Sequence, residues 1–223
     1  MQTNDTIIRD GQAAQNYDEQ ARKTDWFGPE VVFGLAYEFV KPGDMLLDLG
    51  IGSGLSSIPF HKTGLRIYGL DGSREVLEVC AVKNFTEELK EHDLRQFPLP
   101  YADQSFEHIV SVAVLNSFQD LSPVFEEVAR ILKKGGIFAF TVEEQKPGME
   151  DRYPINRVEV SEKPDETAVM LFRHSEAYIN HILVQNGFET LKTLEFVAFK
   201  YPAENRDVLF KAYITQRMRT RKI

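Results

Sequence analysis

Glycines and a carboxylate in residues 44–54, D-M-L-L-D-L-G-I-G-S-G, have the types and the spacing of a nucleotide-binding turn. The apolar run before the turn is typical of a strand buried on both faces of a parallel sheet. Gly50, Gly52 and Gly54 lack a Cβ atom, so the backbone there can turn tightly and approach a ligand closely. A helix expected over residues 53–62 would direct its free N–H groups and its positive dipole end at that ligand. This order of strand, glycine turn and helix predicts a nucleotide-binding βα unit.

The spacing of the glycines and one acidic residue indicate which nucleotide is bound. Nicotinamide and flavin sites use G-x-G-x-x-G, whereas this turn reads G-x-G-x-G and has Leu55 where the longer pattern needs its last small residue. Asp48 precedes the first glycine by two positions, where a carboxylate would repel a pyrophosphate but suits a cationic amino group. S-adenosylmethionine has an amino group, a positive sulfonium and no phosphate. The pattern therefore favours this cofactor over a dinucleotide and disfavours a nicotinamide-dependent reductase.

Residues 46–54 resemble the first motif of the class I S-adenosylmethionine-dependent methyltransferases, hydrophobic–D/E-x-G-x-G-x-G. Two later stretches, H-D-L-R-Q-F-P-L-P-Y-A-D-Q-S-F-E at 92–107 and L-K-K-G-G at 132–136, are also similar to that family. Glu107 departs from the family pattern, which usually has aspartate there, and we expect a structural role for it. The resemblance implies an α/β fold: a doubly wound, mostly parallel seven-stranded sheet with a C-terminal antiparallel edge hairpin and helices on both faces.

Asp71 ends the second expected strand, 23 residues after Asp48. A carboxylate at this position can accept both ribose hydroxyls of an adenosine, and its alternative role is helix N-capping. We favour ribose binding, with Ser73 as the cap. The resemblance places Asp93 near the adenine amino group, the backbone of Leu94 near a ring nitrogen, and residues 111–118 over the methionine end. The candidate cofactor-binding residues are Tyr17, Asp48, Gly50, Gly52, Gly54, Asp71, Gly72, Ser73, Asp93, Leu94 and Ser111.

Alternating strand and helix patterns over residues 44–144 predict a parallel sheet, whose carboxyl ends bind ligands. We expect a single domain over 1–223, with an N-terminal helical lid segment (1–43), the cofactor-binding core (44–144), a hairpin insertion (145–174) and C-terminal helix and strands (175–223). Helices are expected at 10–21, 29–39, 53–62 (with Pro59 in the first turn or at a kink), 74–90, 121–132 and 175–186. Strands are expected at 45–49, 66–70, a short one closing at 92–94, 105–113, 137–142, a hairpin of 157–160 with 167–172, 188–199 and 208–215.

The composition excludes several other classes of protein. The chain has 223 residues, a net charge of -8 and one cysteine, Cys80, which we assign to the core. Nucleic acid is a poor partner for this charge, and one cysteine forms neither an intrachain disulfide nor a cysteine metal cluster, so no metal is expected. The basic C-terminal residues 217–222 are interpreted as a frayed tail. The first ten residues have no apolar core of signal-peptide length and no segment approaches membrane-spanning length, so we expect a cytoplasmic protein that does not bind membranes.

The leading hypothesis is an enzyme that transfers a methyl group from the sulfonium to an O, N or C atom of a small-molecule acceptor by in-line displacement. The alternative is a protein that binds S-adenosylmethionine or S-adenosylhomocysteine without chemistry. No catalytic residue is identified, and the acceptor and the oligomeric state cannot be read from the sequence. Residues 1–27 are expected to form a lid ordered by ligand, and the hairpin insertion to shape the acceptor pocket. Other polar or aromatic candidates, for which packing is the favoured role, are Tyr17, Trp26, Asn116, His174 and Tyr178.

Overall fold

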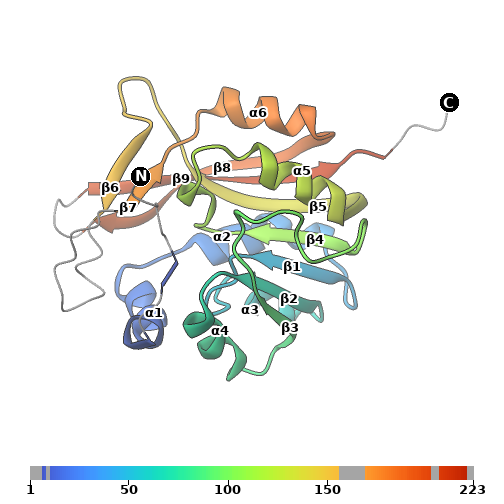
Figure 1. Ribbon diagram of the computed structural model, residues 1–223. Coiled ribbons are helices and arrows are strands. Elements are labelled where there is room, and N and C mark those ends of the chain that lie inside the picture. Colours follow the sequence, from blue (N-terminus) through green and yellow to red (C-terminus); the bar gives the residue numbers. More distant parts are fainter. Residues whose placement is uncertain (1–6, 9–10, 156–168, 202–205, 220–223) are drawn as a thin grey trace.

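A seven-stranded sheet in the order β3-β2-β1-β4-β5-β9-β8 forms the centre of the molecule (Figure 1). The computed structural model describes residues 7, 8, 11–155, 169–201 and 206–219. Strands β1 to β5 run parallel, whereas β9 is antiparallel to both β5 and β8. The expected doubly wound sheet with an antiparallel edge hairpin is confirmed. The strands of this sheet are β1 (Met45–Leu49), β2 (Arg66–Asp71), β3 (Thr86–Glu91), β4 (Phe106–Ser111), β5 (Leu132–Glu143), β8 (Phe188–Tyr201) and β9 (Arg206–Arg217).

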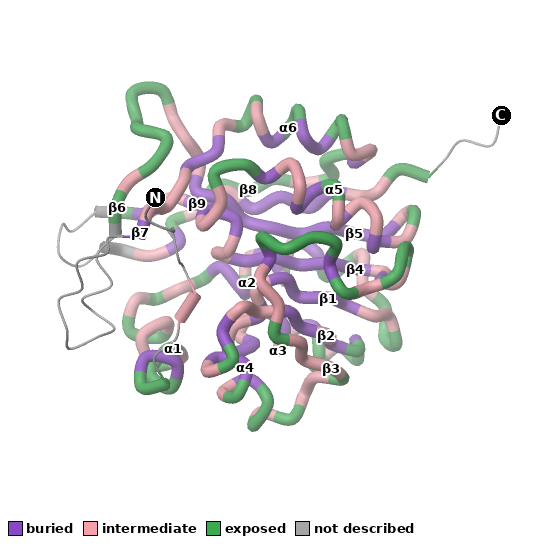
Figure 2. Tube along the Cα trace, in the orientation of Figure 1, coloured by how far each residue is buried: buried purple, intermediate pink, exposed green. Residues whose placement is uncertain are grey.

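Helices cover both faces of the sheet because alternate residues of its central strands are apolar and point to opposite sides. Leu46 packs with apolar residues of α2, α3 and α4 on one face, and Leu47 packs with those of α5 and α6 on the other. Figure 2 shows the buried residues running along the central strands between these helices. No helix in the described ranges is long and apolar enough to cross a membrane. The helices are α1 (Gly11–Lys23), α2 (Gly28–Ala36), α3 (Ile58–Lys62), α4 (Arg74–Ala81), α5 (Ser122–Ile131) and α6 (Glu176–Gln185), with 3-10 turns at Tyr37–Phe39 and Leu115–Ser117.

Several local predictions are confirmed by the structure. Pro59 lies in the first turn of α3, where its missing N–H costs no hydrogen bond. The hydroxyl of Ser73 accepts a hydrogen bond from the N–H of Val76 at 3.1 Å, which makes Ser73 the cap of α4. Cys80 is fully buried in the core. Glu107 has the expected structural role, since its carboxylate accepts from the backbone N–H of Met45 at 2.9 Å and pairs with Lys133.

The prediction of one long helix over residues 74–90 is wrong. Helix α4 ends at Ala81, Asn84 adopts a positive φ of 53°, and Thr86–Glu91 forms the edge strand β3. The T-E-E-L-K-E sequence has no apolar run because β3 has only one neighbouring strand and its residues are at most half-buried. The strand expected to close at 92–94 therefore ends earlier, at Glu91, and residues 92–94 form the turn beyond it. Strand β5 also begins before the expected Ile137, directly after α5.

The insertion forms a two-stranded antiparallel sheet, but with a different first strand. Its strands are β6 (Arg152–Ile155) and β7 (Val169–Phe172), paired from Arg152 opposite Phe172 to Ile155 opposite Val169. The expected hairpin is confirmed for its second strand at 169–172, whereas its first strand lies at Arg152–Ile155, before the predicted 157–160. The predicted strand at 157–160 and residues 167–168 lie outside the described residues. Figure 1 shows the β6–β7 sheet beside the edge of the main sheet at which β5 ends.

Candidate cofactor-binding site

The glycine turn after β1 is held against the end of β2 by backbone hydrogen bonds. The N–H groups of Gly50 and Ile51 both donate to the carbonyl of Leu70, at 2.8 and 3.0 Å. Gly50 has a φ of 77°, and a Cβ there would lie 2.4 Å from a methyl group of Val114. A side chain at this position is therefore excluded by both the backbone conformation and the neighbouring chain. The tight turn predicted from the glycine spacing is present.

Gly52 and Gly54 have different roles although both have positive φ. A Cβ at Gly52, with φ of 55°, would meet nothing closer than a methyl of Val76 at 3.9 Å, so this glycine leaves open space on the ligand side. A Cβ at Gly54, with φ of 90°, would lie 2.4 Å from the ring of Phe85 and 3.0 Å from the sulfur of Cys80. Gly54 thus permits close packing of the turn against the segment around α4, and it does not line the cavity described below.

The carboxylate of Asp71 organises the floor of the site. Its Oδ2 accepts from the N–H of Gly52 at 2.8 Å and its Oδ1 accepts from the N–H of Ser73 at 2.9 Å. Burial raises the pKa of Asp71, and these backbone hydrogen bonds oppose that rise by favouring the charged form. Each oxygen retains a further lone pair for a ligand donor. Asp71 therefore joins the carboxyl ends of β1 and β2 and still presents an acceptor to the cavity.

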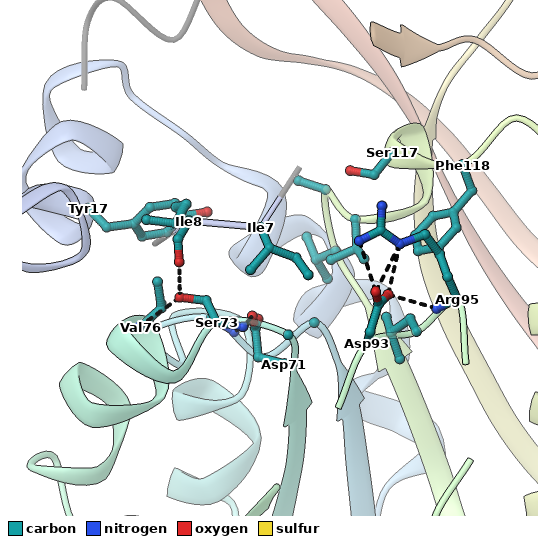
Figure 3. A pocket seen from close by; sticks show the side chains of 17 residues that line it. Ile7, Ile8, Tyr17, Asp71, Ser73, Val76, Asp93, Arg95, Ser117 and Phe118 are labelled. Atoms are coloured by element: carbon teal, nitrogen blue, oxygen red, sulfur yellow. Dashed lines mark hydrogen bonds and ion pairs between the residues drawn. The ribbon is translucent and has the colours of Figure 1, made fainter. Parts of the chain in front are cut away.

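Asp93 faces the same cavity and is held by a residue that the sequence did not single out. Arg95 donates from Nε and Nη2 to the two carboxylate oxygens of Asp93 at 2.9 Å each, and its backbone N–H donates at 2.9 Å (Figure 3). Burial would raise the pKa of Asp93, but the hydrogen bonds and the charge of Arg95 outweigh it and lower that pKa. The carboxylate is therefore ionised at neutral pH and fixed in orientation.

A cavity of about 170 Å³ lies over the ends of β1, β2 and β4 (Figure 3). Of the predicted residues, Asp48, Gly54 and Ser111 do not line it, and all the others do. Its wall also includes Arg95 and Val76, which were not among the candidates. Phe118 and the segment after β4 belong to residues 111–118, which the resemblance had indicated only as a range. The lining residues are Ile7, Ile8, Tyr17, Gly50, Gly52, Asp71, Gly72, Ser73, Val76, Asp93, Leu94, Arg95, Val112, Ala113, Val114, Ser117 and Phe118.

Asp48 and Ser111 lie beneath the turn. Asp48 is 1% exposed, and its Oδ2 accepts from the hydroxyl of Ser57 at 2.7 Å, whereas its Oδ1 has no partner in the described part of the chain. Burial is the main reason why the pKa of Asp48 is raised to about 7, with a smaller contribution from the charge of Asp71. Ser111 is fully buried and donates to the carbonyl of Leu49 at 3.0 Å, a bond that links the ends of β4 and β1.

The N-terminal segment covers the cavity from the side opposite the sheet. The hydroxyl of Ser73 donates to the carbonyl of Ile8 at 2.5 Å, and a side chain of Ile7 lies so close to Gly72 that a Cβ there would be 2.7 Å from it. In Figure 3, Tyr17 and Ile8 face Ser73 and Asp71 across the cavity. Burial and the nearby charge of Asp71 raise the pKa of the Tyr17 hydroxyl, so this group keeps its proton at neutral pH.

Helix α1 is attached to the glycine turn by one carboxylate. Asp18 accepts from the hydroxyl of Ser53 and from the ammonium of Lys83, both at 2.5 Å. Lys83 also donates to the carbonyl of Ser53 at 2.7 Å. These side chains are about a quarter exposed, which screens the ion pair only in part. The position of α1 over the cavity is thus coupled to the position of the turn.

The sequence and the fold were compared with those of known proteins. Residues 47–140 match a family model described as a methyltransferase domain. A demethylmenaquinone methyltransferase of Tropheryma whipplei is 31% identical over 102 residues, 44% of this chain and 41% of that protein. A malonyl-acyl-carrier-protein O-methyltransferase of Serratia marcescens is 28% identical over 144 residues, 62% of this chain and 54% of that protein. A solved SAM-dependent methyltransferase of Methanosarcina mazei is similar with a TM-score of 0.70 at 20% identity, covering 83% of this chain and 98% of that one.

Residues 47–140 therefore form a methyltransferase domain on a class I methyltransferase fold. The family resemblance stated from the sequence is confirmed. The matched regions span between two fifths and about half of the length of these two curated relatives.

Four of the other candidate residues lie outside the cavity of the methyltransferase domain. Tyr178 accepts from the N–H of Leu121 at 2.8 Å and donates to Asp120 at 2.9 Å, and His174 stacks on the Tyr178 ring. Asn116 is buried, and Trp26 packs against Phe199 and Phe210. The contacts of Tyr178, His174 and Trp26 are packing contacts of the kind favoured from the sequence, whereas the buried Oδ1 of Asn116 has no partner among the described residues.

S-adenosylmethionine fits the donors and acceptors of the methyltransferase domain in three respects. The buried Oδ1 of Asp48 has no partner among the described residues, which fits a carboxylate whose charge is balanced by the amino group of a bound ligand. Gly52 leaves a space that a side chain would fill. Asp71 and Asp93 offer acceptors, while Arg95, the one cationic side chain among the described residues of the cavity lining, is already paired with Asp93. The site thus has acceptors for amino and hydroxyl groups and little to attract a pyrophosphate.

Proposed function

We propose that the protein is an S-adenosylmethionine-dependent methyltransferase that acts on a small-molecule acceptor. The observation that carries the proposal is the assembly of the glycine turn, Asp71 and Asp93 around one cavity at the carboxyl ends of the parallel strands. Ligands of open α/β sheets bind at this edge. Relatives matched by sequence are named for methyl transfer to menaquinone precursors and to a carrier-bound malonyl group, which supports the reaction class and leaves the acceptor open.

Each part of the site has a role in this proposal. Asp71 would accept hydrogen bonds from the ribose hydroxyls, and the glycine turn would allow the cofactor to approach the backbone. Asp93, held by Arg95, and the backbone at Leu94 would bind the adenine edge. Asp48 lies beneath the turn and would attract the amino group through its charge. The bound cofactor supplies an activated methyl group, so the protein has to orient two molecules and exclude water from between them.

No dedicated base is needed when the acceptor atom is already a nucleophile. Tyr17, which lines the cavity, has a raised pKa and remains protonated, so it serves as a hydrogen-bond donor and a wall. Aromatic rings attract cations, and the sulfonium is one. The part of Tyr17 in the proposed reaction is therefore to position the cofactor.

Two experiments separate this function from its alternatives. Calorimetric titration with S-adenosylmethionine, S-adenosylhomocysteine and NAD should give binding of the first two and none of NAD. Incubation of the protein with methyl-labelled S-adenosylmethionine and a metabolite extract should transfer label to a small molecule. Binding without transfer to any extract would favour the non-catalytic binding protein, and binding of NAD alone would favour a reductase.

A further inference from the structure

A second cavity adjoins the cofactor-binding cavity. It has a volume of about 230 Å³ and is lined by residues of α1, the α1–α2 connection, the segment after β4, and β8. Tyr17 and Ala113 line both cavities, so the two spaces share a wall. The lining residues are Tyr17, Gln20, Ala21, Thr24, Trp26, Ala113 and Phe199. A methyl acceptor has to meet the cofactor, and an adjoining cavity with a shared wall satisfies that requirement.

The rings of the second cavity are held in place before any ligand binds. The indole of Trp26 makes edge contacts with Phe199 and Phe210, at ring-centroid distances of 6.2 and 5.7 Å. The same ring lies against the backbone of Gly28, where a Cβ would be 2.2 Å from it. Phe210 is buried and belongs to a small apolar cluster with Ala198 and Val208. The aromatic wall is therefore preformed, which reduces the entropy lost on binding.

The shared wall also contains an unusual backbone conformation. Ala113 has a φ of 59°, although it is not a glycine, and its N–H donates to the hydroxyl of Thr141 at 2.9 Å. Positive φ costs a residue with a Cβ on the order of 1 kcal/mol or more and is often found at ligand sites. This turn presents the small side chain of Ala113 to both cavities. A larger side chain at the junction would separate them.

The chemistry of the lining selects the ligand. None of the seven described residues that line the second cavity carries a charge, and three of them are aromatic. Moving a charged group from water into such a space without a partner is costly. The Tyr17 hydroxyl can offer a hydrogen bond to a neutral polar atom, and the Thr24 hydroxyl, which donates to the carbonyl of Gln20 at 3.1 Å, keeps a lone pair that can accept one.

We propose that this second cavity binds the methyl acceptor, and that the acceptor is an uncharged small molecule with an apolar, ring-sized body. The inference rests on the proposed function, because a methyl acceptor exists only if the neighbouring cavity binds S-adenosylmethionine. The acceptor enters with its apolar body against Trp26 and Phe199 and its neutral nucleophilic atom toward the wall formed by Tyr17 and Ala113.

The probe for this proposal is 2-naphthol, compared with 2-naphthoate, which has the same rings and a negative charge. Trp26 is the single tryptophan of the chain, so its fluorescence reports occupancy of the cavity directly. We expect saturable quenching by 2-naphthol and roughly tenfold weaker binding of 2-naphthoate. Equal affinity for the two probes, or no saturable quenching by 2-naphthol, would overturn the proposal.

A matched pair of substitutions tests the location. Ala21→Phe fills the second cavity, and Ala21 is not itself among the described residues that line the first, so 2-naphthol affinity should fall about tenfold while cofactor affinity changes much less. Ala177→Phe makes the same change at an exposed position of α6 and should alter neither. If Ala21→Phe does not fold, as judged by circular dichroism, Phe199→Leu serves instead, with a severalfold loss expected. Unchanged 2-naphthol binding in the folded variant would place the probe elsewhere.

The same titrations distinguish the two hypotheses. Cofactor binding by calorimetry without 2-naphthol binding would leave the proposed function standing and remove the acceptor assignment. Binding of 2-naphthol without any S-adenosylmethionine binding would remove the proposed function, and the assignment of an acceptor would fall with it.

Discussion

The carboxylate of Asp71 accepts a hydrogen bond from the backbone N–H of Gly52 at 2.8 Å, and this bond joins the end of β2 to the glycine turn after β1. Gly50 and Ile51 of the turn also donate to the carbonyl of Leu70, so three hydrogen bonds hold the turn to β2. A ligand that binds Asp71 therefore meets a turn that is already in place. The conformational entropy of the turn is lost when the protein folds, so cofactor binding does not have to offset that loss.

Asp71→Asn should weaken S-adenosylmethionine binding while keeping the fold. An amide preserves one acceptor oxygen for the backbone but removes the negative charge, and hydrogen bonds to charged groups contribute about 1.5–3 kcal/mol. The dissociation constant measured by calorimetry should rise about tenfold or more. Asp151→Asn, at an exposed position, is the control and should bind normally. An unchanged affinity of the Asp71 variant would show that the ribose does not contact this carboxylate.

Gly52 and Gly54 should respond differently to substitution. Gly52→Val places a branched side chain in the open space of the cavity, so cofactor binding should be lost, and the φ of 55° adds backbone strain that lowers stability as well. Gly54→Ala places a Cβ 2.4 Å from the ring of Phe85, so the loss should appear as lower stability, by about 1–3 kcal/mol. Denaturant unfolding and calorimetry on both variants measure the two effects. Normal binding by folded Gly52→Val protein would contradict the assignment of the glycine turn to the ligand.

The parts of the site that could be predicted from the sequence depend on short-range geometry. The glycine turn follows from a strand, three glycines and a helix within a few residues. The position of Asp71 follows from the rule that parallel strands bring their carboxyl ends to one edge. Both the spacing and the edge are properties of the backbone alone. The structure accordingly brings Gly50, Gly52, Asp71 and Asp93 together around one cavity.

The features that the sequence did not predict are of two kinds. Some are side-chain contacts, including contacts between residues far apart in the sequence, and the other is an edge strand that is only partly buried. The sequence of β3 has no apolar periodicity because an edge strand with one neighbour buries little. The pairing of Arg95 with Asp93 is a choice of side-chain conformation, although the D-x-R spacing is a signal that could have been noted. The contact of Ile8 with Ser73 spans 65 residues and has no local signature.

The affinity for S-adenosylmethionine should rise with pH up to about neutrality because of Asp48. Its pKa of about 7 lies well above the usual carboxyl value, owing mainly to burial, and only the ionised form attracts a cationic amino group. Below pH 7 the affinity should fall roughly tenfold per pH unit. Calorimetry between pH 5.5 and 7.5 measures this slope, and Asp48→Asn should abolish it. A pH-independent affinity of the unmodified protein would exclude a role of the Asp48 charge in cofactor binding.

The same shift affects folding in the opposite direction. Between about pH 4 and pH 7, the native state keeps a proton on Asp48 that the unfolded chain has released. The unfolded state therefore binds fewer protons, and the contribution of Asp48 to stability decreases as pH rises through this window. In the absence of cofactor, Asp48→Asn should reduce the loss of stability between pH 5 and pH 7, as followed by denaturant unfolding.

Arg173→Met should destabilise the protein by about 3–5 kcal/mol, because it leaves a charge buried without its partner. Arg173 Nε donates to Oε1 of Glu143 at 2.7 Å, both side chains are under a tenth exposed, and Tyr153 donates to the other oxygen at 2.5 Å. These contacts join the β6–β7 sheet to the end of β5. The double variant Arg173→Met with Glu143→Gln should recover part of the loss in denaturant unfolding. Equal stability of the single variant and the unmodified protein would contradict this role.

Cofactor binding should increase the hydrogen-exchange protection of α1. The helix contacts the cavity through Tyr17, and Asp18 attaches it to Ser53 and Lys83 beside the glycine turn. A ligand that fixes the turn and fills the cavity therefore stabilises both attachments of α1, the one through Tyr17 and the one through Asp18, and local opening of the helix becomes rarer. Amides of residues 11–23 should exchange about fivefold or more slowly with S-adenosylmethionine bound, whereas those of α6 should not change. Asp18→Asn weakens the attachment and should reduce the difference. Equal exchange of residues 11–23 with and without cofactor would show that this segment is a static flank and would exclude its role as a lid.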